Sequence, residues 1–208
     1  MVPAGTITAD AAVDFSNSFG DIGLGVDLGY GITDELEVTL SGVGAAVTPD
    51  FALNKAFGLS AGYSVIADGD LNLAPALGLG LNFNEGADPL DNISVGLNSR
   101  YNLMDNQLSL HFGDGLFSYS LAGESWQLDV ALGVAYQIND SINVRVDTNL
   151  FGTDGDANSS IADVTPLDLT VIYALGAAMD VGLGLGFGDL QNAGDTMTAG
   201  LSFAWRGL

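Results

Sequence analysis

Apolar residues alternate with glycine and polar residues over most of the chain. From residue 22 to residue 32, the even positions are Ile, Leu, Val, Leu, Tyr and Ile, and the odd positions are glycine except for one aspartate. Residues 126–138 and 179–188 alternate in the same way. Successive side chains of a β-strand point to opposite faces, so each segment predicts a strand with one apolar face and one small or polar face. Extended over the whole sequence, this pattern predicts about twelve strands of roughly 10–14 residues.

Aromatic residues mark both ends of the predicted strands. One set closes the alternating runs just before short turns and recurs about every 35 residues: Tyr30, Tyr63, Tyr101, Tyr136, Tyr173 and Trp205. A second set lies at the opposite ends of the runs: Phe15, Phe51, Phe83, Trp126 and Phe187. A repeat of this length holds two strands and two turns, which is a β-hairpin. Aromatic residues at two levels of such hairpins are typical of the girdles at the membrane–water interfaces of a transmembrane β-barrel.

The predicted connections alternate in length. Short turns are expected at 33–34, 67–70, 104–107, 139–140 and 176–178. Mostly longer loops are expected at 16–20, 47–50, 84–91, 113–125, 152–163 and 189–195. Outer-membrane barrels have short periplasmic turns and longer extracellular loops. The repeated tyrosines lie at the short-turn ends, so we expect them at the periplasmic interface.

Two segments, 29–38 and 135–144, combine an outward aromatic residue, a tight turn and the start of the next strand. Through them the chain resembles bacterial outer-membrane β-barrels of the small porin-like class, with no specific family, over nearly its whole length. The resemblance implies an all-β fold in a single domain, residues 1–208: a transmembrane antiparallel up-and-down β-barrel of about 12 strands. It also implies a location in the bacterial outer membrane. Counts of ten or fourteen strands stay open, because the irregular stretch 113–125 could hide or split a strand.

Composition narrows the classes of function. Although 48% of the residues are apolar, no run approaches the roughly 18 consecutive apolar residues of a membrane-spanning helix. The chain has no cysteine, and 26 acidic residues against four basic ones give a formal net charge of −22. So acidic a chain repels nucleic acid and attracts cations. A soluble acidic β-protein from a saline setting is an alternative explanation of the charge, but it does not explain the aromatic spacing.

If the apolar face of each strand meets lipid, the polar face turns inward. The charged residues predicted to line the pore are Asp10, Asp14, Asp27, Glu35, Glu37, Arg100, His111, Asp129, Arg145, Asp147, Asp168, Asp180 and Arg206. Acids predominate, and a narrow passage focuses their field and concentrates cations. We therefore predict a porin, or channel, for passive diffusion of small, preferentially cationic or neutral solutes, including ion transport. The alternative is a closed structural or surface-recognition barrel whose acidic extracellular loops bind a partner or a divalent cation.

Other candidate sites are weak. Ser109 and His111 share the predicted inward face, but no third group that would orient the base is evident, so no enzymatic activity is predicted. Asp154, Asp156 and Asn158 alternate like the first ligands of a calcium-binding loop, but the glycine and glutamate that complete such a loop are missing. They are therefore a weak metal candidate, and no cofactor is expected.

The expected partners are the lipid bilayer of the outer membrane and small solutes or cations, and nucleic acid is excluded by charge. A monomer and a homotrimer are both compatible with the sequence. The N-terminus lacks the basic region and apolar core of a secretion signal. We therefore interpret the chain as a processed form, with Met1 as an added residue.

Overall fold

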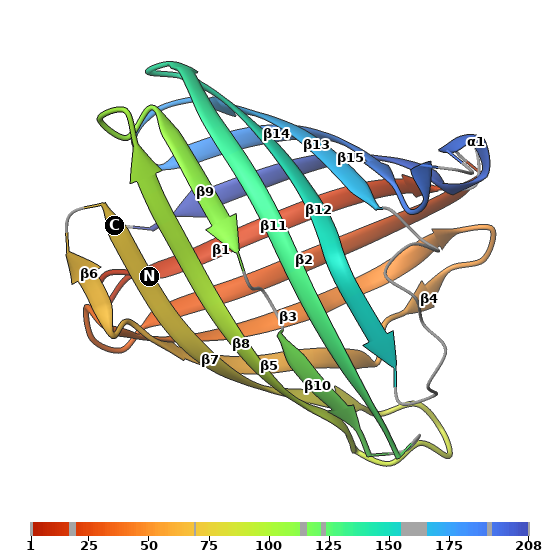
Figure 1. Ribbon diagram of the computed structural model, residues 1–208. Coiled ribbons are helices and arrows are strands. Elements are labelled where there is room, and N and C mark those ends of the chain that lie inside the picture. The colour runs from red at the N-terminus through yellow and green to blue at the C-terminus, as the bar shows by residue number, and fades with distance from the viewer. Residues whose placement is uncertain are drawn as a thin grey trace.

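The computed structural model describes residues 2–16, 20–68, 70–112, 116–121, 124–154, 166–190 and 193–207. For residues 68, 129 and 150–154 it describes the backbone and not the side chain. The strands form one closed antiparallel β-barrel, which Figure 1 shows from the side. The prediction of an all-β up-and-down barrel of twelve strands is confirmed.

Each position around the barrel is filled by one long strand or by shorter strands in succession. The long strands are β1 (Ile7–Ser16), β2 (Asp21–Gly31), β3 (Leu36–Thr48), β7 (Leu71–Asn82), β8 (Leu90–Leu103), β11 (Ser125–Asn139), β12 (Ile142–Asp154), β13 (Leu167–Ala174), β14 (Met179–Phe187) and β15 (Met197–Arg206). β4 (Ala52–Leu53), β5 (Ala56–Tyr63) and β6 (Ile66–Asp68) together fill the fourth position. β9 (Leu108–Phe112) and β10 (Phe117–Ser120) fill the seventh, because each pairs with both β8 and β11. A short helix, α1 (Ala193–Thr196), precedes β15.

The barrel closes between its first and last strands. β1 pairs with β2 on one side and with β15 on the other, where Thr8 lies opposite Arg206 and Phe15 opposite Ala199. The N and C marks accordingly lie at the same end of the barrel in Figure 1. Closure gives β1 and β15 a hydrogen-bonded neighbour on both sides, so neither presents an open edge.

One predicted loop contains a strand. The sequence predicts a loop at 113–125, and this is wrong for residues 117–120, which form β10. Phe117 lies opposite Val95 of β8 and opposite Leu128 of β11. Without β10 these two strands would expose unpaired backbone groups, and that cost favours pairing even with a strand of four residues. Four residues are too few for alternation alone to predict a strand.

Large apolar side chains cover the outer face of the barrel. On β14, Leu183 is 55% exposed and alternates with glycines that face the inside. Among the described residues, the buried apolar residues are Ala74 and Ala135. The apolar surface is therefore turned outward, the inverse of a water-soluble β-protein. Within the same described ranges, no helix is long and apolar enough to cross a membrane.

β2 and β3 approach each other closely beside a bulge. The register of the pair shifts around Asp27, whose Oδ1 accepts a hydrogen bond from the Gly42 amide at 2.8 Å. Gly42 has a φ of 76°, a conformation that favours glycine. A Cβ added at Gly44 would lie 2.0 Å from the carbonyl oxygen of Leu24. Any side chain at position 44 would therefore force the two strands apart.

Gly44→Ala should destabilise the barrel by about 1–3 kcal/mol, because the added methyl group overlaps a backbone oxygen that cannot rotate away. Gly25→Ala is the matched control: Gly25 lies opposite Gly44, and nothing lies within 4 Å of its added Cβ. Urea unfolding of both variants, refolded in detergent micelles and followed by tryptophan fluorescence, measures the difference. Equal unfolding midpoints for the two variants would contradict the close approach.

Candidate functional site

The strands bring most of the predicted pore-lining residues to the inner face of the barrel. They are Asp10 and Asp14 on β1, Asp27 on β2, Glu37 on β3, Arg100 on β8, His111 on β9, Arg145 and Asp147 on β12, Asp168 on β13, Asp180 on β14 and Arg206 on β15. Glu35 lies in the turn before β3, where its carboxylate accepts a hydrogen bond from Thr33 Oγ1 at 3.0 Å. Asp129 lies on β11, and its side chain is outside the described part of the chain.

Two inner-face arginines are neutralised by nearby carboxylates. Arg145 Nε lies 2.8 Å from Asp147 Oδ1 and 2.7 Å from Asp147 Oδ2. Arg206 pairs with Asp180 on the neighbouring strand β14. These pairs remove two bases and two acids from the charge that a solute would meet inside the barrel.

Acids remain in excess after this pairing. In the described part of the chain, Asp10, Asp14 and Asp168 form no ion pair. Asp10 lies opposite Asp27 across the β1–β2 pair, and Asp147 lies opposite Asp168 across the β12–β13 pair. Like charges directly opposite each other in a sheet are destabilising. The inner face thus holds acids that repel one another across neighbouring strands.

Arg100 lies near the short-turn end, in a cavity lined by both basic and acidic residues. The cavity has a volume of about 380 Å³, and its other charged or titratable lining residues are His111, Asp140, Arg145, Asp180 and Arg206. Arg100 Nε donates to Asn102 Oδ1 at 2.7 Å, and among the described residues no carboxylate pairs with Arg100. The inner face is therefore acidic overall but has one region where a guanidinium group lacks a counter-ion.

Ser109 and His111 form the pair that the sequence raised as a weak candidate. Ser109 Oγ lies 2.9 Å from His111 Nε2. Ser109 is only 3% exposed, so its hydroxyl group has almost no surface from which to reach a substrate. We interpret the contact as a hydrogen bond that orients the imidazole ring on the inner face.

The wall formed by β5, β7 and β8 is smooth. Ser94 Oγ lies 2.3 Å from the place that a Cβ would take at Gly78, and Asn92 Oδ1 lies 2.5 Å from the corresponding place at Gly80. These polar side chains therefore lie flat over the glycines of the adjacent strand instead of extending inward. A cavity of about 350 Å³ follows this wall.

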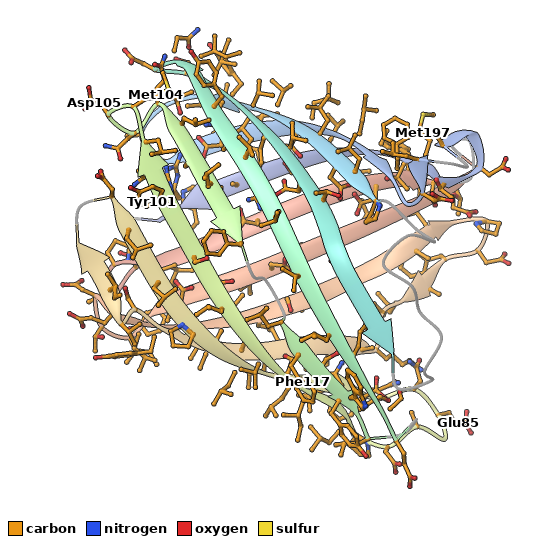
Figure 2. All side chains as sticks on the ribbon, in the orientation of Figure 1. Glu85, Tyr101, Met104, Asp105, Phe117 and Met197 are labelled. Atoms are coloured by element: carbon orange, nitrogen blue, oxygen red, sulfur yellow. The ribbon has the colours of Figure 1, made fainter. Side chains whose placement is uncertain are left out.

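The first aromatic set lies at the short-turn ends of the strands. The exposed fraction of its tyrosine side chains reaches 51% at Tyr63, and Trp205 is also exposed. Figure 2 shows Met104 and Asp105, in the turn after β8, at this end of the barrel. The position of this first aromatic set fits residues at a membrane–water interface, and that role stays a prediction.

The second aromatic set lies toward the opposite end, where Figure 2 shows Glu85. Phe83 stacks on Phe57 with ring centroids 5.3 Å apart, and Trp126 stacks on Phe117 at 6.5 Å. The other members of this set are Phe15, Phe51 and Phe187. Stacking joins neighbouring strands at this level and adds to their pairing.

The weak calcium-loop candidate stays a prediction. Asp156 and Asn158 lie outside the described residues, as does the side chain of Asp154. In the described part of the chain, no group of three histidine, aspartate or glutamate side chains is placed to hold a metal ion.

The alternating pattern of the sequence does not predict one segment of the inner face. Residues 2–6 fold against the inside of the barrel, where the Val2 amide donates to Glu37 Oε2 at 2.7 Å. Gly29 and Gly31 leave space for this segment. Glycine occurs on the inner face of many strands, so the sequence alone does not single out these two positions.

Solved structures share this architecture. The NanC porin has a TM-score of 0.70 at 10% identity, with 95% of this chain and 98% of that chain covered. The KdgM porin in complex with disordered oligogalacturonate has a TM-score of 0.68 at 8% identity over the same shares. The outer membrane protein Omp33 of Acinetobacter baumannii has a TM-score of 0.53 at 10% identity over 99% and 100%. The fold is that of a bacterial outer-membrane β-barrel.

No protein-family model matches the chain, and neither does any curated protein sequence. Because the sequence identity to these solved structures is 8–10%, the similarity shows the fold alone. It confirms the resemblance to small outer-membrane porins as a class, without a specific family. The pore-lining role of individual residues remains a prediction.

A pair of cysteine variants tests which face meets water. Thr170 and Val171 are adjacent on β13, and Thr170 faces the inside while Val171 is exposed on the outer face. In liposomes, a charged thiol reagent should modify Thr170→Cys at least about tenfold faster than Val171→Cys, because the reactive thiolate forms where water reaches it. Each variant has a single cysteine, so mass spectrometry reads the rate directly. Equal rates would show that the faces are assigned wrongly.

Proposed function

We propose that the protein is an outer-membrane porin through which small, preferentially cationic or neutral solutes diffuse passively. The observation that carries the proposal is the excess of acids without an ion pair on the inner face of a barrel whose outer face is apolar. Fold neighbours that are porins support a channel for small solutes. The preference for cations is inferred from the charges of this chain alone.

The outer face supports a location in a lipid bilayer. Leu77 is 65% exposed, and large apolar side chains of all the long strands are exposed with it. Apolar surface in water costs about 25 cal/mol per Å², so a barrel with this outer face is stable where lipid covers it. The two aromatic sets would then lie at the two membrane interfaces.

The inner face supports a mechanism of biased diffusion. Asp14, Asp27 and Asp168 come from three strands within the run of adjacent strands from β13 to β2, so this part of the inner wall presents negative charge to a solute. A low-dielectric wall focuses this field and raises the local concentration of cations. The region around Arg100 attracts anions locally, so the mechanism predicts a preference and not an exclusion. The smooth wall of β5, β7 and β8 leaves room for the solute.

Removing two acids should weaken the cation preference. In planar bilayers under a KCl gradient, Asp14→Asn combined with Asp168→Asn should lower the ratio of potassium to chloride permeability by about two- to threefold, because the focused negative potential falls. Arg100→Gln is the matched control of opposite sign and should raise the ratio. Both are measured as shifts of the reversal potential.

A ratio that stays unchanged in both variants would contradict the proposed selectivity. Silence of wild-type protein that is shown to be folded and inserted would contradict the channel itself. That second result would favour the alternative of a closed structural or surface-recognition barrel, whose acidic loops would then be tested for divalent-cation binding.

A further inference from the structure

Residues 2–6, here called the N-terminal strap, fold back along the inside of the barrel at its short-turn end. The Gly5 amide donates to the carbonyl oxygen of Gly31 at 2.8 Å, so the strap pairs with the end of β2. The Val2 amide then donates to Glu37 Oε2 on β3 at 2.7 Å. The strap therefore crosses the inner surface of two adjacent strands.

Two glycines of β2 allow the strap to lie against the wall. A Cβ added at Gly31 would lie 2.1 Å from the carbonyl oxygen of Pro3 and 2.5 Å from that of Val2. A Cβ added at Gly29 would lie 2.5 Å from Thr8 Oγ1 of β1 and 3.6 Å from Val2 Cγ2 of the strap. Both glycines alternate with Tyr30, which is exposed on the outer face, so they face the inside. At Gly31, only glycine is compatible with the observed strap.

The strap also lines a cavity at the short-turn end. It forms one side of this cavity of about 510 Å³, whose other side includes Asp10 of β1 and the ion pair of Arg206 with Asp180. The cavity is therefore bounded by an uncharged segment of main chain and by charged side chains of the wall.

We propose that the N-terminal strap is the constriction that sets the size limit of the channel at its short-turn mouth. The inference rests on the proposed function, since a size limit has meaning only if solutes pass. The strap has no charged side chain, so it restricts size, while the acids of the inner face bias charge. The Glu37 carboxylate accepts a hydrogen bond from the Val2 amide at the start of the strap, and Asp34 Oδ1 accepts one from the Ala4 amide at 3.0 Å.

The first test displaces the strap by substitution and by deletion. Gly31→Ala should expel it, because the added methyl group overlaps the backbone of Pro3 and Val2. Deletion of residues 2–4 removes the part of the strap whose backbone lies against Gly31, including Val2 and Pro3. Gly25→Ala is the matched control, since it adds the same methyl group to the same face of β2 with nothing within 4 Å.

Unit conductance and the largest polyethylene glycol that enters the channel are measured for each protein. Gly31→Ala and the deletion should each raise conductance by about 1.5- to 2-fold, since conductance follows the width of the narrowest section. Gly25→Ala should conduct like the wild type. Combining Gly31→Ala with the deletion should add nothing to the deletion alone, because both act on the same segment.

Wild-type conductance and size limit in both Gly31→Ala and the deletion variant would overturn the constriction while leaving the proposed channel intact. A silent wild type would overturn both.

A covalent test locates the strap independently of conduction. Val2→Cys with Gly29→Cys introduces the sole two cysteines of the chain at neighbouring positions. Mild oxidation of the folded protein should form an intramolecular disulfide, detected by mass spectrometry, and reduction should reverse it. Two free thiols after oxidation, in protein that is folded by gel mobility, would overturn the placement of the strap.

Discussion

The closed ring of backbone hydrogen bonds is the constraint on which the rest of this structure depends. β1 pairs with β15, and the short strands β9 and β10 together fill the space between β8 and β11. In lipid an unpaired backbone group costs several kcal/mol, so a sheet that crosses a membrane must close on itself. In a closed barrel, each side chain of a strand points either to the outer face or to the inner face. Large apolar groups then face outward, and glycine, serine and charged groups face inward.

In the proposed channel, the preference for charge and the limit on solute size depend on different parts of the inner face. The proposed charge preference comes from strand residues such as Asp14 and Asp168, which belong to the wall. The proposed size limit comes from the uncharged N-terminal strap, which lies against the wall at the short-turn end. A barrel of twelve strands lies between those filled by their own side chains and those that enclose a wide channel.

The sequence predicted local features well because they depend on local physics. Alternation in segments such as 22–32 fixed which faces are apolar, and the turn at 104–107 lies where polar residues interrupt that pattern. What it could not predict depends on residues distant in sequence. β10 is too short to show a period and forms because two neighbouring strands need a partner. The pairing of Arg206 with Asp180 requires knowing that β14 and β15 are adjacent in this register.

The N-terminal strap is another feature that depends on residues distant in sequence and that the sequence alone does not predict. Its residues show no alternation, and the space it occupies is created by two glycines of β2 that look like many others in the chain. Only the register that sets Gly31 beside the strap backbone reveals the contact. Arg100, in turn, was predicted to face the inside, but that it lacks a carboxylate partner follows from the three-dimensional arrangement of its neighbours.

The proposed function requires that this barrel conducts ions through an acidic interior. The most direct test is the reversal potential of the unmodified, detergent-folded protein in a planar bilayer under a KCl gradient. Discrete current steps that reverse at a potential on the cation-selective side of zero are the predicted result. Steps that reverse on the anion-selective side, or no steps from protein shown to be inserted, would contradict the account.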